Sequence, residues 1–449
     1  MQTKNKRSIL NAWASYDMAN SVYSLCIATA IFPPFYEGLT SLKDEKGVLI
    51  NDAVSFFGWV LPNTVLYSYA LSFAFLIIAF LAPLLSGIAD NSGNKKSFMK
   101  FFVYLGAISC AALYFFEPAT EKIFPVRVEL PIIAFITATI GFSGSLVFYN
   151  SFLPEIATPD RFEKISARGF AMGYGGSVFL LVANLMMIQK PEWFGLTNSA
   201  EAARISFLTV GLWWAGLSQI AFYHLPAGNK KSTLNPNALS SGFSELRKVF
   251  LELKNLPALR IFLLAFFFLS MGLQTVLYVA SIFGKKVLDL ETSKLIVTVL
   301  LIQIVAIPGS YFFAYAANKK GNILTLSAGS LVWIGICVAA YFTYTEYQFY
   351  ALAGLVGWVM GGVQSLCRAT YSRLLPRAHD TAAFYSFLDA TEKFGVVLGT
   401  FIYGLIESVS GNMRNSILGL IVFFVFATIS LFRINIKNKR NNGIEQHSG

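Results

Sequence analysis

The chain has 449 residues, of which 55% are hydrophobic and only 13% are charged. Soluble proteins have about 45–50% apolar and about 25% charged residues, so this composition excludes the ordinary soluble class. The four cysteines all fall inside apolar segments, and the three histidines lie at segment ends or in the C-terminal tail. This placement predicts no disulfide framework, no metal site and no other cofactor.

A membrane-spanning helix requires about 20 apolar residues. Twelve segments of the sequence reach this length, so we predict an all-α membrane protein with twelve transmembrane helices. The predicted helices cover residues 9–36, 63–87, 97–116, 131–152, 165–188, 204–224, 259–284, 294–317, 322–344, 347–370, 382–406 and 413–434.

Lys and Arg are unevenly distributed between the two sides that these helices imply. The side with both termini carries 24 of them in tails, loops and adjoining helix ends, and the opposite side carries 10. The positive-inside rule therefore predicts that both termini are cytoplasmic. The net charge of +11 is thus a topological signal, and we expect no nucleic acid partner.

The longest polar connection, residues 226–257, separates the sixth predicted helix from the seventh. It contains a predicted amphipathic helix, either interfacial or a solvated linker, with Phe243 and Val249 on its apolar face. We therefore divide the chain into a six-helix bundle over 1–228, a cytoplasmic linker over 229–257, and a second bundle with a tail over 258–449.

Short internal repeats relate these two bundles. Residues 86–94 follow the second predicted helix and match residues 314–322 after the eighth, 228 positions later, so that Asp90 aligns with Asn318. Residues 149–154 match residues 371–376 at an offset of 222. Two parallel six-helix halves related by an axis along the membrane normal describe the major facilitator fold.

Asp17 lies well inside the first apolar segment. A carboxylate in hydrocarbon costs roughly 2.5–3.5 kcal/mol, so such residues usually face a polar interior. Other polar and aromatic residues share its helical face: Trp13, Asn20 and Ser24, with Tyr16 beside them. Asp17 is therefore a candidate proton, cation or substrate site. The alternative is a structural carboxylate, bound by Tyr, Asn or Arg of a neighbouring helix.

The eleventh predicted helix holds a second intramembrane charge cluster. Asp389 and Lys393 are i,i+4 neighbours in the favourable acid-first order and can form a structural ion pair. Glu392 would then be the unpaired, titrating member. Arg368 on the tenth predicted helix could instead neutralise either acid.

The loop after the second predicted helix contains Asp90 between Gly87 and Gly93. An acid at this place can accept hydrogen bonds from the N-terminal amides of a helix in the other half, which would close one side of the bundle. We therefore assign Asp90, Gly87, Gly93 and the repeat partner Asn318 to a gate. The alternative is a tight turn that uses the glycines for packing and positive φ.

Further polar residues within the apolar spans are candidates for lining a central cavity or for satisfying a neighbouring helix. These are Asn150, Tyr149, Gln274, Gln303 and Gln364. Glycines of the fifth and tenth predicted helices permit close helix packing. They are Gly173, Gly175, Gly176, Gly361 and Gly362.

Several motifs resemble one known family. Residues 87–96 are similar to the loop signature of the major facilitator superfamily. Four further segments resemble its vacuole-effluxer-like group: 13–21, 148–156, 303–309 and 361–376. The resemblance implies release of amino acids or similar metabolites. The group commonly has an Asp-Gly pair in its seventh helix, where this chain has Met271 and Gly272.

Together, these features predict a secondary active transporter that exports a small solute by alternating access. No ATP-binding motif is visible in the sequence, so an ion gradient, with protons as a candidate, or the solute's own gradient must drive it. We expect a monomer that contacts membrane lipid and a small-molecule substrate. The alternatives are an exporter of drug-like or lipid-like compounds, or a non-transporting scaffold or sensor of the same fold. No set of residues suggests an enzyme.

Overall fold

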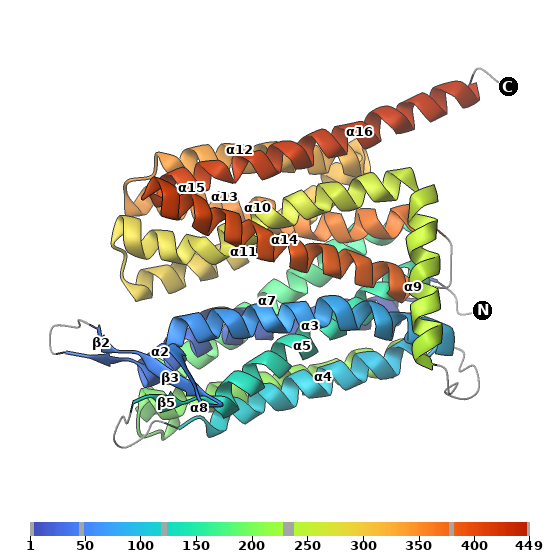
Figure 1. Ribbon diagram of the computed structural model, residues 1–449. Coiled ribbons are helices and arrows are strands. Elements are labelled where there is room, and N and C mark those ends of the chain that lie inside the picture. The colour runs from blue at the N-terminus through green and yellow to red at the C-terminus, as the bar shows by residue number, and fades with distance from the viewer. Residues whose placement is uncertain (1–3, 45–48, 118–123, 228–237, 377–380, 447–449) are drawn as a thin grey trace.

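The computed structural model describes residues 4–44, 49–117, 124–227, 238–376 and 381–446. Long helices form two layers, with the first half of the chain in one layer and the second half in the other (Figure 1). Twelve helices of the described residues are long and apolar enough to cross a membrane. The prediction of an all-α, twelve-helix membrane protein in two halves is therefore confirmed.

The first layer begins with a long continuous helix and contains all the strands. Its elements are α1 (Arg7–Val22), the π-helix η1 (Tyr23–Ile31), α2 (Phe32–Thr40), β1 (Leu42–Lys43), β2 (Leu49–Asn51), β3 (Ala53–Phe56), β4 (Trp59–Pro62), α3 (Asn63–Ser92), α4 (Lys95–Ala112), the 3-10 helix η2 (Leu113–Phe115), β5 (Val126–Arg127), α5 (Glu129–Ser151), α6 (Leu153–Ile156), the 3-10 helix η3 (Pro159–Arg161), α7 (Phe162–Gln189), the 3-10 helix η4 (Pro191–Phe194) and α8 (Ser199–His224).

The second layer is helical throughout the described residues. It comprises α10 (Pro257–Leu288), α11 (Thr292–Lys320), α12 (Asn322–Tyr341), α13 (Glu346–Leu374), α14 (Thr381–Ser410), α15 (Met413–Gly419) and α16 (Ile421–Gln446), and α9 (Ala238–Asn255) connects it to the first layer.

The first span is longer than predicted. Helical backbone continues past Pro33 and Pro34 to Thr40, because η1 passes directly into α2 and both prolines fall in the first turn of that helix. A proline has no N–H to donate to the carbonyls of η1, which fits the place of both prolines at the change from π-helix to α-helix. Within η1, the Thr29 hydroxyl donates to Ser24 O over 2.8 Å, a reach of five residues that fits the wider π turn.

The strands were not predicted from the sequence. β1 pairs with β2, and β3 lies between β4 and β5, so the loop after α2 is hydrogen-bonded to the connection that precedes α5. These strands have two to four residues each, too few for an alternating pattern to be recognised in the sequence. We call this end of the bundle the strand end.

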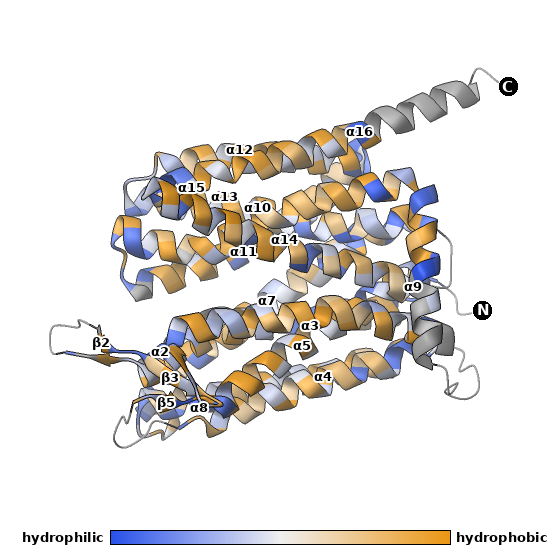
Figure 2. Ribbon diagram, viewed as in Figure 1, coloured by the Kyte–Doolittle hydropathy of each residue, from blue (hydrophilic) through white to orange (hydrophobic). Residues whose placement is uncertain are grey.

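The opposite end carries α9, and we call it the linker end. α9 lies across the ends of the other helices and packs on α3, α10 and α14 (Figure 1). Val249 is fully buried against the bundle, whereas Phe250 and Leu251 are exposed. Hydrophobic residues dominate the middle of the long helices, and hydrophilic residues gather at the two ends and on α9 (Figure 2).

Close helix packing depends on several of the glycines expected to allow it. An added Cβ at Gly361 would lie 2.3 Å from Ala306 O of α11, and one at Gly362 would lie 2.2 Å from the Phe313 ring. Gly173 approaches α1 in the same way, since a Cβ there would lie 2.6 Å from Ser21 Oγ. Gly175 has no such neighbour closer than Ile307 at 4.0 Å, so its position does not require glycine for space.

Candidate functional site

The two halves are joined from the middle of the bundle to the linker end. All hydrogen bonds and ion pairs that link described side chains of one half to described residues of the other lie in this region. The innermost connects the Tyr174 hydroxyl to Gln364 Oε1 at 2.8 Å. The linker end is therefore the closed end of this structure.

Asp17 forms a buried ion pair with Arg368 of the other half. Arg368 Nη2 donates to Asp17 Oδ2 at 2.8 Å, and Nη1 donates to Oδ1 at 3.3 Å. The side chains are only 7% and 6% exposed. Asp17 lies ten residues after the start of α1, or about 15 Å along the helix at 1.5 Å per residue. The pair therefore spans the two halves well inside the bundle.

Further residues of the first half complete the surroundings of Arg368. Nε donates to Ser166 Oγ at 2.9 Å, Nη2 donates to Ser166 O at 2.9 Å, and Nη1 donates to Asn150 Oδ1 at 3.3 Å. The guanidinium carbon lies 4.2 Å from the centre of the Phe170 ring and 4.7 Å from that of Trp13. Such ring faces stabilise a cation that has left water.

The sequence suggested Arg368 as a partner for the acids of α14, and this was wrong. Its guanidinium points to α1, so the structural alternative for Asp17, an Arg of another helix, is the arrangement observed. Within α14, Lys393 Nζ lies 3.6 Å from Asp389 Oδ1, as the i,i+4 spacing predicted. Glu392 has no ion pair among the described residues, as predicted, but its carboxylate accepts a hydrogen bond from Gln274 Nε2 of α10 at 2.7 Å.

Gly169 forms the wall behind the Asp17–Arg368 pair and was not recognised from the sequence. A Cβ at this position would lie 2.3 Å from Asp17 Oδ2 and 2.7 Å from Arg368 Nη2. Real Cβ atoms do not approach other atoms so closely, and the buried pair has little room to move. Only a glycine fits between α7 and this ion pair.

We therefore expect Gly169→Ala to displace the ion pair and to lower the thermal unfolding midpoint of the purified protein. Overpacking of this kind destabilises by about 1–3 kcal/mol. The matched control is Gly216→Ala in α8, where an added Cβ meets nothing within 4 Å. Because Ala favours a helix over Gly by about 1 kcal/mol, the control should be neutral or stabilising. Equal midpoints for the two variants would contradict this account of Gly169.

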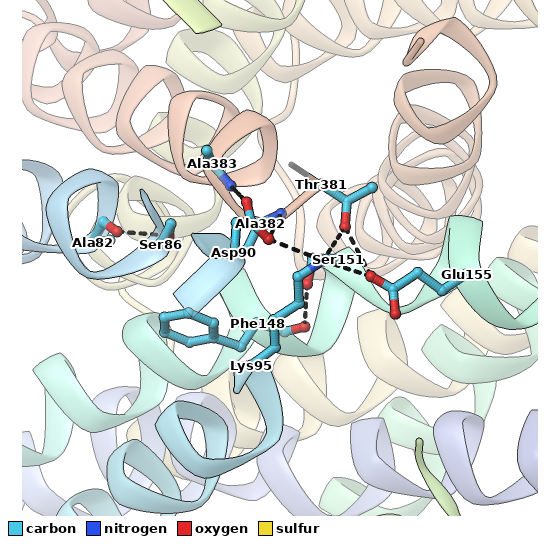
Figure 3. A network of polar contacts seen from close by, with 10 residues as sticks. All are labelled: Ala82, Ser86, Asp90, Lys95, Phe148, Ser151, Glu155, Thr381, Ala382 and Ala383. Atoms are coloured by element: carbon cyan, nitrogen blue, oxygen red, sulfur yellow. Dashed lines mark hydrogen bonds and ion pairs between the residues drawn. The ribbon is translucent and has the colours of Figure 1, made fainter. Parts of the chain in front are cut away.

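Asp90 lies at the end of α3 and reaches the first turn of α14 in the other half (Figure 3). Its carboxylate accepts from Ala383 N at 2.8 Å and from Ala382 N at 3.3 Å. The first amides of a helix have no intrahelical acceptor, and the helix dipole favours a negative charge there. This is the contact predicted for the gate, and the Asp90 side chain is fully buried in it.

Lys95 connects the same junction to α6. Its ammonium lies 3.0 Å from Asp90 Oδ1 and 2.5 Å from Glu155 Oε1, and it donates to Thr381 Oγ1 at 2.5 Å. Lys95 is 8% exposed and joins both halves. Gly93 has φ 66° and ends α3 in the left-handed region, so its role is the turn itself. Gly87 is buried within α3.

A second junction at the linker end uses residues that the sequence did not identify. Glu163, 1% exposed at the start of α7, accepts from Arg373 Nη2 at 2.7 Å and from Asn322 Nδ2 at 2.7 Å. The predicted repeat partner of Asp90, Asn318, is exposed instead, and no hydrogen bond of its side chain occurs among the described residues. Asn322, four residues later, makes the inter-half contact on this side.

The other candidates are distributed over several contacts. Asn20 and Tyr16 are buried on α1, and Tyr16 packs on Tyr149 with ring centres 4.6 Å apart. Gln303 of α11 is half-buried, and its Oε1 is enclosed without a partner among the described residues. The α1 candidates therefore lie beside the central ion pair, whereas Gln274 and Glu392 form a separate site between α10 and α14.

Comparison with known proteins identifies the family. The family described as "Vacuole effluxer Atg22 like" matches residues 5–443. The chain belongs to this family. It is 31% identical over 426 residues to the uncharacterized MFS-type transporter YxiO of Bacillus subtilis (strain 168), covering 94% of this chain and 93% of that protein. Autophagy-related protein 22 of Saccharomyces cerevisiae (strain ATCC 204508 / S288c) is 23% identical over 420 residues, covering 82% and 77%.

Solved structures place this vacuole effluxer family member in the major facilitator fold. The transporter FucP, solved in the outward conformation, matches with a TM-score of 0.68 at 14% identity, covering 95% of this chain and 99% of that chain. The human organic anion transporter MFSD10 gives a TM-score of 0.68 at 11% identity, covering 96% and 100%. The predicted family and fold are thus confirmed, and the protein is a multi-pass membrane protein of an MFS-type transporter family.

Proposed function

We propose that the protein exports a small metabolite of the amino-acid class by alternating access, as a secondary active transporter. The observation that carries this proposal is the buried Asp17–Arg368 ion pair, whose two charges come from different halves of the bundle. Opening the linker end would separate them. A rigid scaffold has no need for charges at such a place, whereas a transporter uses them to bind a solute in one state and to close in the other.

The distribution of inter-half contacts supports this cycle. Asp90, Lys95 and Glu163 join the halves at the linker end, and the described residues form no comparable hydrogen bond or ion pair at the strand end. FucP, whose title states an outward conformation, has the same fold. We therefore interpret the structure as an outward-facing state, closed toward the cytoplasm by these junctions.

The proposed orientation places both termini and α9 in the cytoplasm of a bacterial plasma membrane. It rests on the excess of Lys and Arg on the linker side. We expect a cysteine introduced at Asn255, an exposed residue at the end of α9, to react with a membrane-impermeant maleimide only after cells are permeabilised. The four native cysteines are buried, so the unmodified chain is the control. Labelling in intact cells would reverse the orientation.

The driving force is an ion gradient, and we propose protons as the coupling ion. The sequence indicated Asp17 as the carrier, but Arg368 now engages both of its oxygens. Glu392 is the alternative: it is half-buried, accepts from Gln274, and shares α14 with Asp389 and Lys393. A pH gradient imposed on proteoliposomes tests coupling, since Glu392→Gln should abolish pH-driven accumulation but retain exchange.

Transport itself is tested with the purified protein in proteoliposomes. Vesicles loaded with unlabelled amino acids are diluted into a trace of the labelled compound, and accumulation by exchange is measured against empty liposomes. A thermal-shift screen chooses the solutes, because a ligand that binds only the folded state raises its stability. Exchange of drug-like or lipid-like compounds but not amino acids would favour the alternative cargo. No exchange of any solute that binds would favour a scaffold or sensor.

A further inference from the structure

Arg368 belongs to the second half, but its guanidinium group is bound by residues of the first half. Every hydrogen bond of its guanidinium ends on an acceptor of that half: both Asp17 carboxylate oxygens, Asn150 Oδ1, Ser166 Oγ and Ser166 O. In the closed state the Ser166 hydroxyl also donates to Ser365 O of the second half at 2.7 Å. The first half therefore presents a complete set of acceptors for one planar cation.

Aromatic rings of the same half enclose this set of acceptors. The guanidinium carbon lies 4.2, 4.7 and 5.6 Å from the ring centres of Phe170, Trp13 and Tyr149. The rings hold one another in place: Trp13 stacks on Tyr149 at 4.6 Å, and its indole N–H donates to Tyr149 O at 3.0 Å. Gly169 leaves the space that the cation fills. We call this arrangement the cation box.

We propose that the cation box is the recognition site for a guanidinium group of the cargo, and that Arg368 is its tethered occupant in the closed state. This inference deepens the proposed transport function and rests on it. When the halves separate at the linker end, Arg368 leaves with α13, and the cation box stays with α1, α5 and α7. A cargo cation can then bind to Asp17 in place of Arg368.

Asp17 needs a cation whenever it is buried, because leaving one charge of a buried pair without its partner costs about 3–5 kcal/mol. Arg368 is that cation when the linker end is closed, and a cargo cation can take its place only when the linker end is open. On closure, Arg368 competes for the same acceptors and displaces the cargo toward the strand end. Arg368 thereby acts as a built-in competitor that favours release on that side.

The geometry favours a guanidinium over an ammonium. The two Asp17 oxygens accept from Nη1 and Nη2, and the Ser166 hydroxyl and carbonyl oxygens accept from Nε and Nη2. A planar fork matches this arrangement, whereas an ammonium has three donors in a tetrahedral array and would leave acceptors unpaired. Flat rings on its faces also favour a planar cation.

The first test compares arginine with citrulline, in which an uncharged urea group replaces the guanidinium at nearly the same size. In proteoliposomes of the wild-type chain, we expect arginine to drive exchange at least tenfold more effectively than citrulline. Arginine should also increase maleimide labelling of Ala382→Cys, a position that is fully buried in the closed state. Citrulline should not. Wild-type protein without this cysteine is the control.

The second test removes the tethered cation. Purified Arg368→Ala should gain thermal stability from methylguanidinium, and the double variant with Asp17→Asn should not. If Arg368→Ala does not fold without the compound, a yield of folded protein from cells grown with methylguanidinium would support the cation box equally. Equal responses to arginine and citrulline, with robust exchange of neutral amino acids, would overturn the cation box and leave the proposed transport intact. Absence of exchange with every solute would instead overturn transport itself.

Discussion

Asp90→Ala is expected to slow solute exchange in proteoliposomes at least tenfold while solute binding stays nearly unchanged. The variant loses two hydrogen bonds from α14 amides to a carboxylate and an ion pair with Lys95 at 3.0 Å. Hydrogen bonds to charged groups contribute about 1.5–3 kcal/mol each, and a loss of only 1.4 kcal/mol already changes the balance of two states tenfold. Fewer molecules would then occupy the state with a closed linker end, and every transport cycle must pass through that state.

Amide hydrogen exchange locates this effect. Residues 381–388 at the start of α14 should exchange faster in Asp90→Ala, because the amides of Ala382 and Ala383 lose their acceptor. The matched control is Asp160→Ala at the same end of the bundle, where the acid is exposed and lies 3.9 Å from Arg161. Exposed pairs contribute about 0–1 kcal/mol. If solute transport and amide hydrogen exchange were both unchanged in Asp90→Ala, the loop after α3 would be only a tight turn.

The helices and their order could be predicted because the membrane imposes a strong pattern on the sequence. A span needs about 20 apolar residues, and each predicted segment overlaps one observed span. The contact of Asp90 with the start of α14 was predictable for a similar reason: Asp90 lies in a short motif whose chemistry is local to one loop and one helix end. Elements without a period or a motif, such as the strands and η1, were missed.

Pairing between the halves could not be read from single residues. Asp17 and Arg368 are 351 positions apart, and their contact depends on how α1, α7 and α13 pack. The sequence suggested that Arg368 could neutralise an acid of α14, because α13 and α14 are consecutive helices. The order of helices along the chain does not report contacts across the interface between the halves. Glu163 was missed because an acid at the start of a helix is ordinary. Its burial against Arg373 and Asn322 is a property of the assembled bundle.

Gly169 shows that the sequence also does not reveal which glycines lack space for a side chain. Several glycines of α7 were recognised as packing residues from composition, but nothing in the sequence distinguishes Gly169 from Gly175. The distinction comes from what a Cβ would meet, an ion pair at 2.3 Å in one case and a methyl group at 4.0 Å in the other. Knowledge of the pair therefore has to precede any assignment of a role to this glycine.

The largest stability effects are expected at the central ion pair. Asp17→Asn leaves the Arg368 guanidinium buried without its carboxylate, and Arg368→Gln leaves the Asp17 carboxylate buried without its cation. Each single variant should lose about 3–5 kcal/mol of stability, because the remaining charge is uncompensated. The double variant Asp17→Asn/Arg368→Gln removes both charges and should recover most of this loss. Thermal unfolding of the wild type, the two single variants and the double variant measures the coupling free energy between Asp17 and Arg368.

A matched cycle uses the exposed pair Lys286–Glu407 between α10 and α14, whose atoms lie 3.9 Å apart with the lysine 64% exposed. Its neutral variants should show coupling below about 1 kcal/mol. If Asp17 and Arg368 showed equally little coupling, their contact would not hold the halves together. A transport assay distinguishes a structural role of the ion pair from a role in transport. The neutral double variant should fold but fail to exchange solute, because the cation box then lacks the Asp17 carboxylate that attracts a cation.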